Sequence, residues 1–251
     1  MLGFLASYAI LRWSGSGLGF WGSLLLVSSI GFGNLALTTL NEIMDMETDR
    51  INKPWKPLPS GEVSVKTAWI SVMVFASISI SSLFALMARD IFYSIGLIGL
   101  LTGLVYNTGR KDIFGNLCLG ITYGVSALMV AYPKTIQMIF AFSFATFTVA
   151  YNLLVQLQDY YADKTSGIIT APQQLGKWCI PISGALCSLS TIITLWLFLL
   201  TLRWFLALFI LANITIVASL IRPSKKVIEW SQRRLGRFFI TVAFLWMVLT
   251  P

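Results

Sequence analysis

Long apolar stretches follow one another along almost the whole chain, and they limit its fold more than any other feature. Each approaches the roughly 20 residues that a helix needs to cross the hydrocarbon core of a membrane. Hydrophobic residues make up 57% of the 251 residues and charged residues only 11%, whereas soluble domains carry about 25% charged residues. A soluble enzyme and a disordered chain are therefore excluded. We expect an all-α, polytopic transmembrane helical bundle of about nine spans, near residues 1–12, 18–44, 67–88, 91–108, 113–132, 135–158, 177–201, 204–221 and 235–250.

Lysines and arginines are divided unevenly between the two sets of alternating loops. Fourteen of the 18 follow the second, fourth, sixth and eighth spans, and the positive-inside rule places those loops in the cytoplasm. No long polar segment interrupts the pattern, so we expect residues 1–251 to form a single integral-membrane domain. Residues 1–12 lack the charged start of a signal peptide, and we expect them to be the end of a first transmembrane helix.

Histidine is absent from the sequence, which excludes histidine-ligated metals and histidine-based acid–base chemistry. Any metal must be held by oxygen, and this favours magnesium or calcium over zinc. Three cysteines without CxxC spacing lie in apolar surroundings, at Cys118, Cys179 and Cys187. Their odd number argues against a framework of disulfides.

Four aspartates stand out because they form two pairs with i,i+4 spacing, Asp45 with Asp49 and Asp159 with Asp163. This spacing places both carboxylates of a pair on one helix face, about one turn apart. Asn41 extends the first pair by a further turn, and Gln156 lies three residues before the second pair. Each pair occurs where an even-numbered span reaches the positively charged side. The two pairs are therefore predicted to converge on one pocket.

Two carboxylate pairs without histidine form a hard, oxygen-rich site suited to Mg²⁺, which prefers carboxylates, waters and substrate phosphates. Nearby cations can hold further phosphate oxygens, and these are Lys53, Lys56, Arg110, Lys111 and Lys164. An apolar bundle below such a site would accept a lipid tail. The residues therefore favour a lipid diphosphate as ligand, and they leave open a cation-transport site or simply solvated helix ends.

Three segments carry a resemblance to a known family. The segment NEIMDMETDRINKPWKPLPSG, from Asn41 to Gly61, resembles the first signature of the UbiA-type intramembrane prenyltransferase superfamily, in which an Asn-Asp-Asp stripe precedes NKPxRPxPSG. The segment DYYADKTSGIITAPQQLG, from Asp159 onward, is similar to its DxxxD motif with the following glycine and the turn of small residue and proline. Between them, YNTGR matches the YxxxK position of the family, with arginine in place of lysine.

The resemblance implies a helical bundle around a central cavity, with two Mg²⁺ ions that bridge the aspartate motifs to a polyprenyl diphosphate. It implies catalytic and metal-binding roles for Asp45, Asp49, Asp159 and Asp163. It also implies substrate binding by Asn41, Lys53, Tyr106 and Arg110, although Tyr106 equally fits an interfacial tyrosine at a helix end. Two positions depart from the family pattern. Gln156 stands where many relatives have an acidic residue, and Lys56 replaces the usual arginine.

The leading function on these grounds is Mg²⁺-dependent transfer of a prenyl group from its diphosphate to an aromatic or lipid acceptor inside the membrane. A UbiA-type terpene cyclase would share the same motifs, because both enzymes must ionise the diphosphate. A divalent-cation carrier and a binding-only protein are the remaining alternatives. The expected partners are a polyprenyl diphosphate, membrane lipid and an acceptor, with no nucleic acid.

Overall fold

The computed structural model describes residues 18–109, 111–132, 135–165, 167–201 and 204–221. Within them the chain is helical, and its pairing of β type is limited to one isolated bridge between Lys111 and Thr170. The long elements are α2 (Gly19–Met44), α4 (Val65–Met87), η1 (Ile91–Ser94) running into α5 (Ile95–Asn107), α6 (Ile113–Ala131), α7 (Thr135–Gln158), α10 (Cys179–Thr201) and α11 (Trp204–Ile221). The all-α prediction is confirmed. The spans expected at 1–12 and 235–250 lie outside the described residues.

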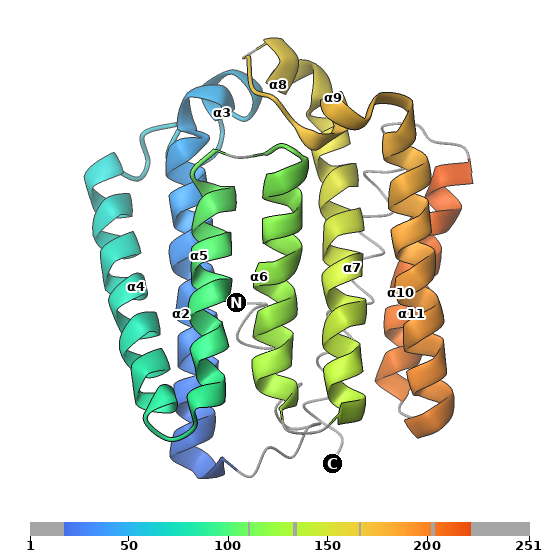
Figure 1. The fold of residues 1–251 in the computed structure, drawn as a ribbon. Coiled ribbons are helices and arrows are strands. Elements are labelled where there is room, and N and C mark those ends of the chain that lie inside the picture. The colour runs from blue at the N-terminus through green and yellow to red at the C-terminus, as the bar shows by residue number, and fades with distance from the viewer. Residues whose placement is uncertain (1–17, 110, 133–134, 166, 202–203, 222–251) are drawn as a thin grey trace.

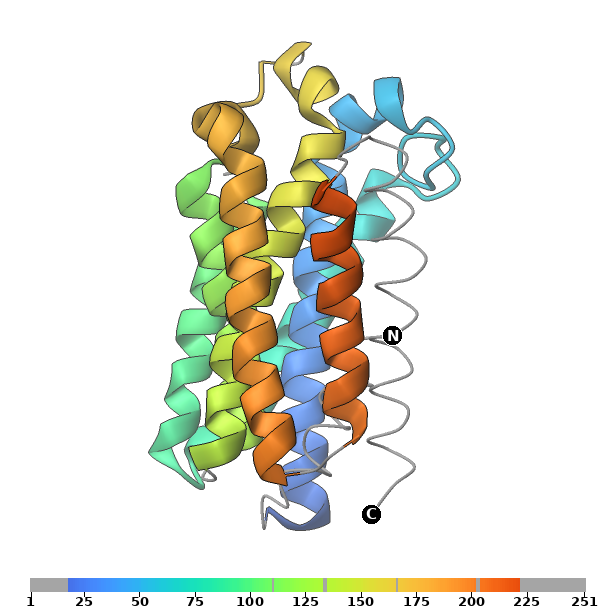
Figure 2. The same cartoon turned by 90° about the vertical axis from the view of Figure 1, so that its right-hand side faces the viewer.

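Consecutive long helices lie side by side and pack in pairs: α2 with α4, α5 with α6, α6 with α7, α7 with α10 and α10 with α11 (Figure 1). Four short elements connect them, namely α3 (Met46–Asn52), α8 (Tyr160–Thr165), α9 (Ala171–Leu175) and η2 (Gly176–Trp178). Two perpendicular views place α3 and α8 at the same end of the bundle (Figures 1 and 2). The segments that carry the two aspartate motifs therefore meet at one end.

Apolar and polar side chains are distributed as a membrane requires. Five of the described helical segments are long and apolar enough to cross a bilayer, and those at Ile91–Asn107 and Leu206–Ala218 are shorter apolar helices. Large apolar side chains such as Ile70, Phe84 and Leu101 are exposed on the outside of the bundle. Inside it, hydroxyl groups bond across helices, as the Ser79 hydroxyl does to the carbonyl of Ser29 at 2.6 Å. This arrangement leaves few unpaired polar groups towards lipid.

Several polar residues outside the motifs have local structural roles. The Ser64 side chain caps α4 by accepting from the Thr67 amide, and the Asp112 carboxylate caps α6 by accepting from the Gly115 amide. Asp90 caps η1 in the same way. These bonds satisfy amides that a helix start leaves without intrahelical partners. The three cysteines are buried, and no disulfide joins them in the described residues.

Candidate active site

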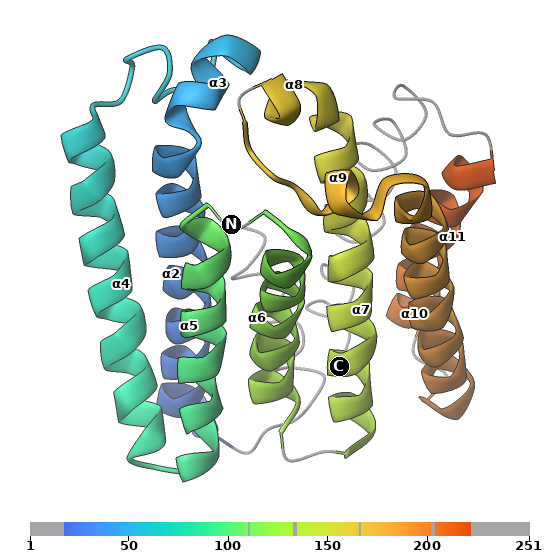
Figure 3. The same cartoon turned by 45° about the horizontal axis from the view of Figure 1, so that its top comes forward.

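Both aspartate motifs begin at a junction between a long helix and a short one. Asp45 lies between the end of α2 and the start of α3, and Asp159 lies between α7 and α8. In each motif the amide of the second aspartate donates to the carbonyl of the first, at 2.8 Å for Asp49 and 2.9 Å for Asp163. The two carboxylates of each motif are therefore one helical turn apart, as their spacing predicts. Figure 3 shows the two junctions facing each other across the end of the bundle.

Side chains of the first motif form a dense local network. The Asn41 amide donates to Asp45 Oδ2 at 2.9 Å, so both residues lie on one stripe of the helix. Lys56 Nζ lies 2.7 Å from Asp49 Oδ2 and 2.7 Å from Glu42 Oε2. Glu42 was not singled out by sequence, but it joins the site because the loop after α3 folds Lys56 back onto α2.

Lys53 connects the two motifs. Its ammonium nitrogen lies 3.0 Å from Asp159 Oδ2 and 3.7 Å from Asp49 Oδ1. Asp159 follows Lys53 by 106 positions, and the two aspartates belong to the ends of the second and sixth predicted spans. One cation thus bridges the aspartate pairs, and their convergence is a feature of the fold.

A second lysine closes the site from the loop between α5 and α6. Lys111 Nζ lies 2.6 Å from Asp45 Oδ1, and its carbonyl accepts the Ala171 amide at 2.8 Å, which ties this loop to the one before α9. Lys111 had been counted only among the surrounding cations. Arg110, the residue that the family motif selects, lies outside the described residues.

Burial and charge shift the pKa values of several site residues. Burial raises the pKa of Asp163 to about 6; Lys111 and Lys53 oppose this rise, while Asp159 and Asp45 add to it. Burial lowers the pKa of Lys111, but the carboxylates of Asp45 and Asp163 raise it more, so the net shift is upward. Burial likewise lowers the pKa of Lys56, and Asp49 and Glu42 reverse the shift. Lys56 and Lys111 are therefore charged, whereas the surrounding cations only partly offset the effect of burial on Asp163.

A buried chain of hydrogen bonds lies beside the second motif. The Tyr106 hydroxyl donates to Asn152 Oδ1 at 3.2 Å, and the Asn152 amide donates to Asn116 Oδ1 at 2.9 Å. Asn116 in turn donates to Gln156 Oε1 at 3.0 Å. Gln156 is 5% exposed, and its Nε2 finds no hydrogen-bond partner within the described structure. Tyr106 thus contacts other side chains of the site, and the amides at positions 116 and 152 are site residues that the sequence analysis did not name.

The donors present suit a magnesium ion, although they are not gathered into a ready-made cage. Among the described residues no three acidic, cysteine or histidine side chains form a group that could hold a metal. Instead the carboxylates of both motifs pair with ammonium groups at 2.6–3.0 Å. The side-chain donors that both motifs offer are carboxylate oxygens, which are hard ligands, and in the described structure lysine ammonium groups of the chain itself lie against them. The donor set therefore fits Mg²⁺.

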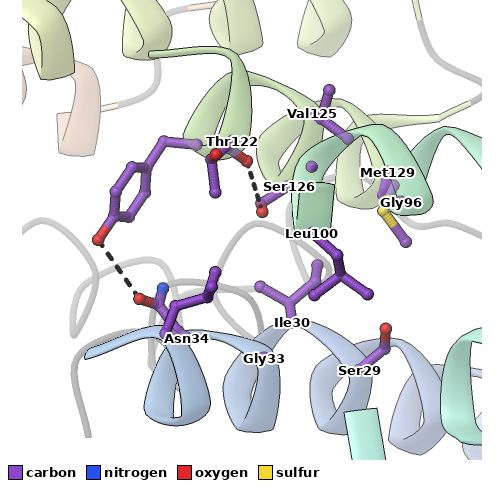
Figure 4. A pocket seen from close by; sticks show the side chains of 13 residues that line it. Ser29, Ile30, Gly33, Asn34, Gly96, Leu100, Thr122, Val125, Ser126 and Met129 are labelled. Carbon is purple, nitrogen blue, oxygen red and sulfur yellow. Dashed lines mark hydrogen bonds between the residues drawn. The ribbon is translucent and has the colours of Figure 1, made fainter. Parts of the chain in front are cut away.

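Below the carboxylates, a cavity of about 30 Å³ lies between α2, α5 and α6. Figure 4 shows its lining, which is partly apolar (Ile30, Leu100, Val125, Met129) and partly polar (Ser29, Asn34, Thr122, Ser126). The hydroxyl of Ser126 donates to the carbonyl of Thr122, so part of this polarity is satisfied within α6. The cavity provides room inside the bundle on the side of the first motif.

An apolar helical bundle with aspartate pairs and lysines gathered at one end is a polytopic membrane protein with a charged site at that end. The chain belongs to the UbiA prenyltransferase family, whose pattern matches residues 1–248.

Individual relatives with named activities are similar to part of the chain. It is 33% identical over 177 residues to digeranylgeranylglyceryl phosphate synthase of Methanococcus aeolicus, a match that covers 66% of this chain and 60% of the relative. It is 29% identical over 161 residues to the chloroplastic 2-acylphloroglucinol 4-prenyltransferase of Humulus lupulus, covering 58% of this chain and 39% of the relative. The chain thus spans well under two thirds of the length of these relatives.

A solved structure supports the fold over nearly the full length. The chain resembles a UbiA homologue from Archaeoglobus fulgidus bound to GPP and Mg²⁺, with a TM-score of 0.68 and 18% sequence identity. The superposition covers 99% of this chain and 96% of that one. At this identity the likeness establishes the architecture of the bundle.

Proposed function

We propose that the protein transfers a prenyl group from a polyprenyl diphosphate to an acceptor within the membrane, with Mg²⁺ as cofactor. The observation that carries the proposal is the bridge from Lys53 to both aspartate motifs. It puts two carboxylate pairs and a cation at one end of an apolar bundle, where a diphosphate head can meet charge while its tail stays in lipid. The named activities of the relatives from Methanococcus aeolicus and Humulus lupulus support the same reaction class.

The reaction needs stabilisation of a departing anion. The allylic C1–O bond breaks, the diphosphate leaves with the electron pair, and the acceptor forms a bond to C1 and releases its proton. Lys53, Lys56 and Lys111 supply fixed positive charge for the diphosphate oxygens. Asp45, Asp49, Asp159 and Asp163 would hold Mg²⁺, which supplies Lewis-acid neutralisation of the leaving group. The apolar interior excludes water, which would otherwise capture the allylic cation.

The excess of lysine and arginine in the motif-bearing loops supports a cytoplasmic location for this end of the bundle. The basic residues after α11 that belong to the same pattern lie outside the described residues. The diphosphate would then be recruited from the cytoplasmic leaflet.

A single incubation tests the proposed reaction. Purified protein receives C10, C15 and C20 prenyl diphosphates with Mg²⁺, alone or with a phenolic or a lipid-alcohol acceptor, and all products are identified. We expect an acceptor-dependent prenylated product that disappears in excess chelator and returns with Mg²⁺. A cyclised product from the diphosphate alone would establish a terpene cyclase. Metal flux without diphosphate consumption would identify a carrier.

A further inference from the structure

At the end of the cavity nearer the aspartates, a hydrogen bond between polar side chains connects α2 and α6. Figure 4 shows Asn34 at one end of the cavity and Ser29, Gly96 and Met129 towards the other. Because α2 runs from Gly19 towards the first motif, the Asn34 end is the upper one. There the Tyr123 hydroxyl of α6 donates to Asn34 Oδ1 of α2 at 3.3 Å. Asn34 and Tyr123 both line the cavity, as does Leu37 about one turn nearer the aspartates, so the Asn34–Tyr123 bridge joins two helices across the upper part of the cavity.

The position of this bridge follows from helix geometry. Asn34 precedes Asn41 by seven residues and Asp45 by 11, so all three lie close to one stripe of α2. At 1.5 Å per residue, Asn34 lies roughly 16 Å deeper than Asp45 along the helix. The bridge is thus directly below the first motif, on the path that a tail descending from it would take.

The length of a prenyl chain decides whether its end reaches this bridge. Three bonds of an extended chain span about 3.5 Å, so the four bonds of one isoprene unit span roughly 4.7 Å. A C10 chain whose head is held at Asp45 therefore ends above the bridge, whereas a C20 chain must pass it. The whole cavity, whose wall includes the bridge, has a volume of about 30 Å³, so a longer chain must also move the side chains that line it.

We propose that the Asn34–Tyr123 bridge is a gate that sets which prenyl chain lengths the site accepts, an inference that rests on the proposed function. Opening the bridge in an apolar interior leaves a phenol and an amide unpaired, and this disfavours any chain that must push through it. Shorter chains avoid the penalty because they stop above it. Asn34 and Tyr123 are thus specificity-determining residues.

Tyr123→Phe and Tyr123→Ala in the full-length protein test the gate, with C10 and C20 prenyl diphosphates as probes. Tyr123→Phe removes the hydroxyl and keeps the ring, so the ratio of kcat/KM for C20 over C10 rises about fivefold, the effect of one hydrogen bond. Tyr123→Ala also removes the ring and raises the ratio about tenfold or more. Phe142→Ala is the matched control, because this aromatic ring is exposed on the outer face of α7 and leaves the ratio unchanged.

Binding of the unreactive C10 and C20 prenyl thiodiphosphates separates the gate from the reaction. If the wild type releases no diphosphate from either substrate, the proposed function fails, while the ratio of the two dissociation constants still decides the gate. Should Tyr123→Ala fail to fold, Tyr123→Phe and Asn34→Ala carry the same test. An unchanged ratio in these variants overturns the gate, and so does a shift towards C10, which would show that Tyr123 binds the tail.

Discussion

The two aspartate motifs share a spacing and a position at a helix junction, but their surroundings differ. In the first motif Asp49 is paired within its own segment, since Lys53 and Lys56 lie four and seven residues after it and contact it, and Asp45 has a close partner in Lys111. In the second motif the counter-ion comes from the segment of the first, because Asp159 pairs with the same Lys53. Lys164 is exposed on α8 and forms no ion pair with the residues that the structure describes.

The carboxylates of the two motifs therefore differ in how fully they are paired. The first motif is a preformed network in which each described carboxylate has a close partner. The second holds Asp163, which is 5% exposed and whose pKa burial raises to about 6. A carboxylate in that state gains more from an added cation than one that is already paired. We therefore interpret the second motif as the half that responds to metal and substrate.

The largest expected effect comes from removing one carboxylate of either half. Asp45→Ala and Asp163→Ala should each lower turnover by about a hundredfold or more, because members of a shared site act as a unit. Their stabilities should differ. Asp45→Ala leaves the half-buried ammonium of Lys111 unpaired and costs about 1–3 kcal/mol, whereas Asp163→Ala removes a charge that burial disfavours above pH 6.

Turnover of a diphosphate substrate and thermal unfolding in detergent measure the two effects. Glu47→Ala is the control, since this exposed carboxylate pairs only with Arg50 among the described residues and should leave turnover within about twofold. A variant that keeps more than a few percent of wild-type turnover would remove that aspartate from the proposed metal site. Equal stability losses would remove the distinction between the motifs.

An intermediate effect is expected when the shared cation is removed. Lys53→Met removes the ion-pair bridge between the motifs, so Asp159 loses its described counter-ion while Asp49 keeps Lys56. We expect kcat/KM for the prenyl diphosphate to fall roughly 10- to 100-fold, in the range of a charge-assisted contact. Arg50→Met is the matched control at an exposed ion pair. Equal, small effects of both changes would mean that Lys53 is not a bridge.

Much of this arrangement could be predicted from the sequence. Apolar stretches of adequate length predict helices because no other structure satisfies the backbone in lipid, and the described helices begin and end within a few residues of their predicted positions. The i,i+4 spacing and the shared side of the two loops also follow from periodicity and charge. Each of these features is encoded within one segment of the chain.

Contacts between segments could not be predicted in the same way. The motif match singles out Arg110, yet the described contact to Asp45 comes from its neighbour Lys111, because the direction of a loop side chain depends on the packing of α9 against that loop. The amides of Asn116, which is buried, and Asn152, which is partly buried, could not be predicted either. A signal for them existed, since polar residues inside apolar spans are unfavourable unless they bond to one another or to a ligand.

The smallest expected effect concerns protons and Mg²⁺ at Asp163. Because the raised pKa lies at about 6, lowering the pH through 6 protonates this carboxyl group, and the proton then competes with the metal. The half-saturating Mg²⁺ concentration should rise about fourfold between pH 7.5 and pH 5.5, and stay nearly flat from pH 7 to 8.5. With a carboxyl group of ordinary pKa, about 4, the half-saturating Mg²⁺ concentration would change by only a few percent over the same interval.

Mg²⁺ titrations of diphosphate release at constant ionic strength measure the shift, with Asp159→Asn and Asp163→Asn as paired variants. If the pH effect survives in Asp163→Asn, another group titrates, and the contrast drawn between the two motifs fails at this residue.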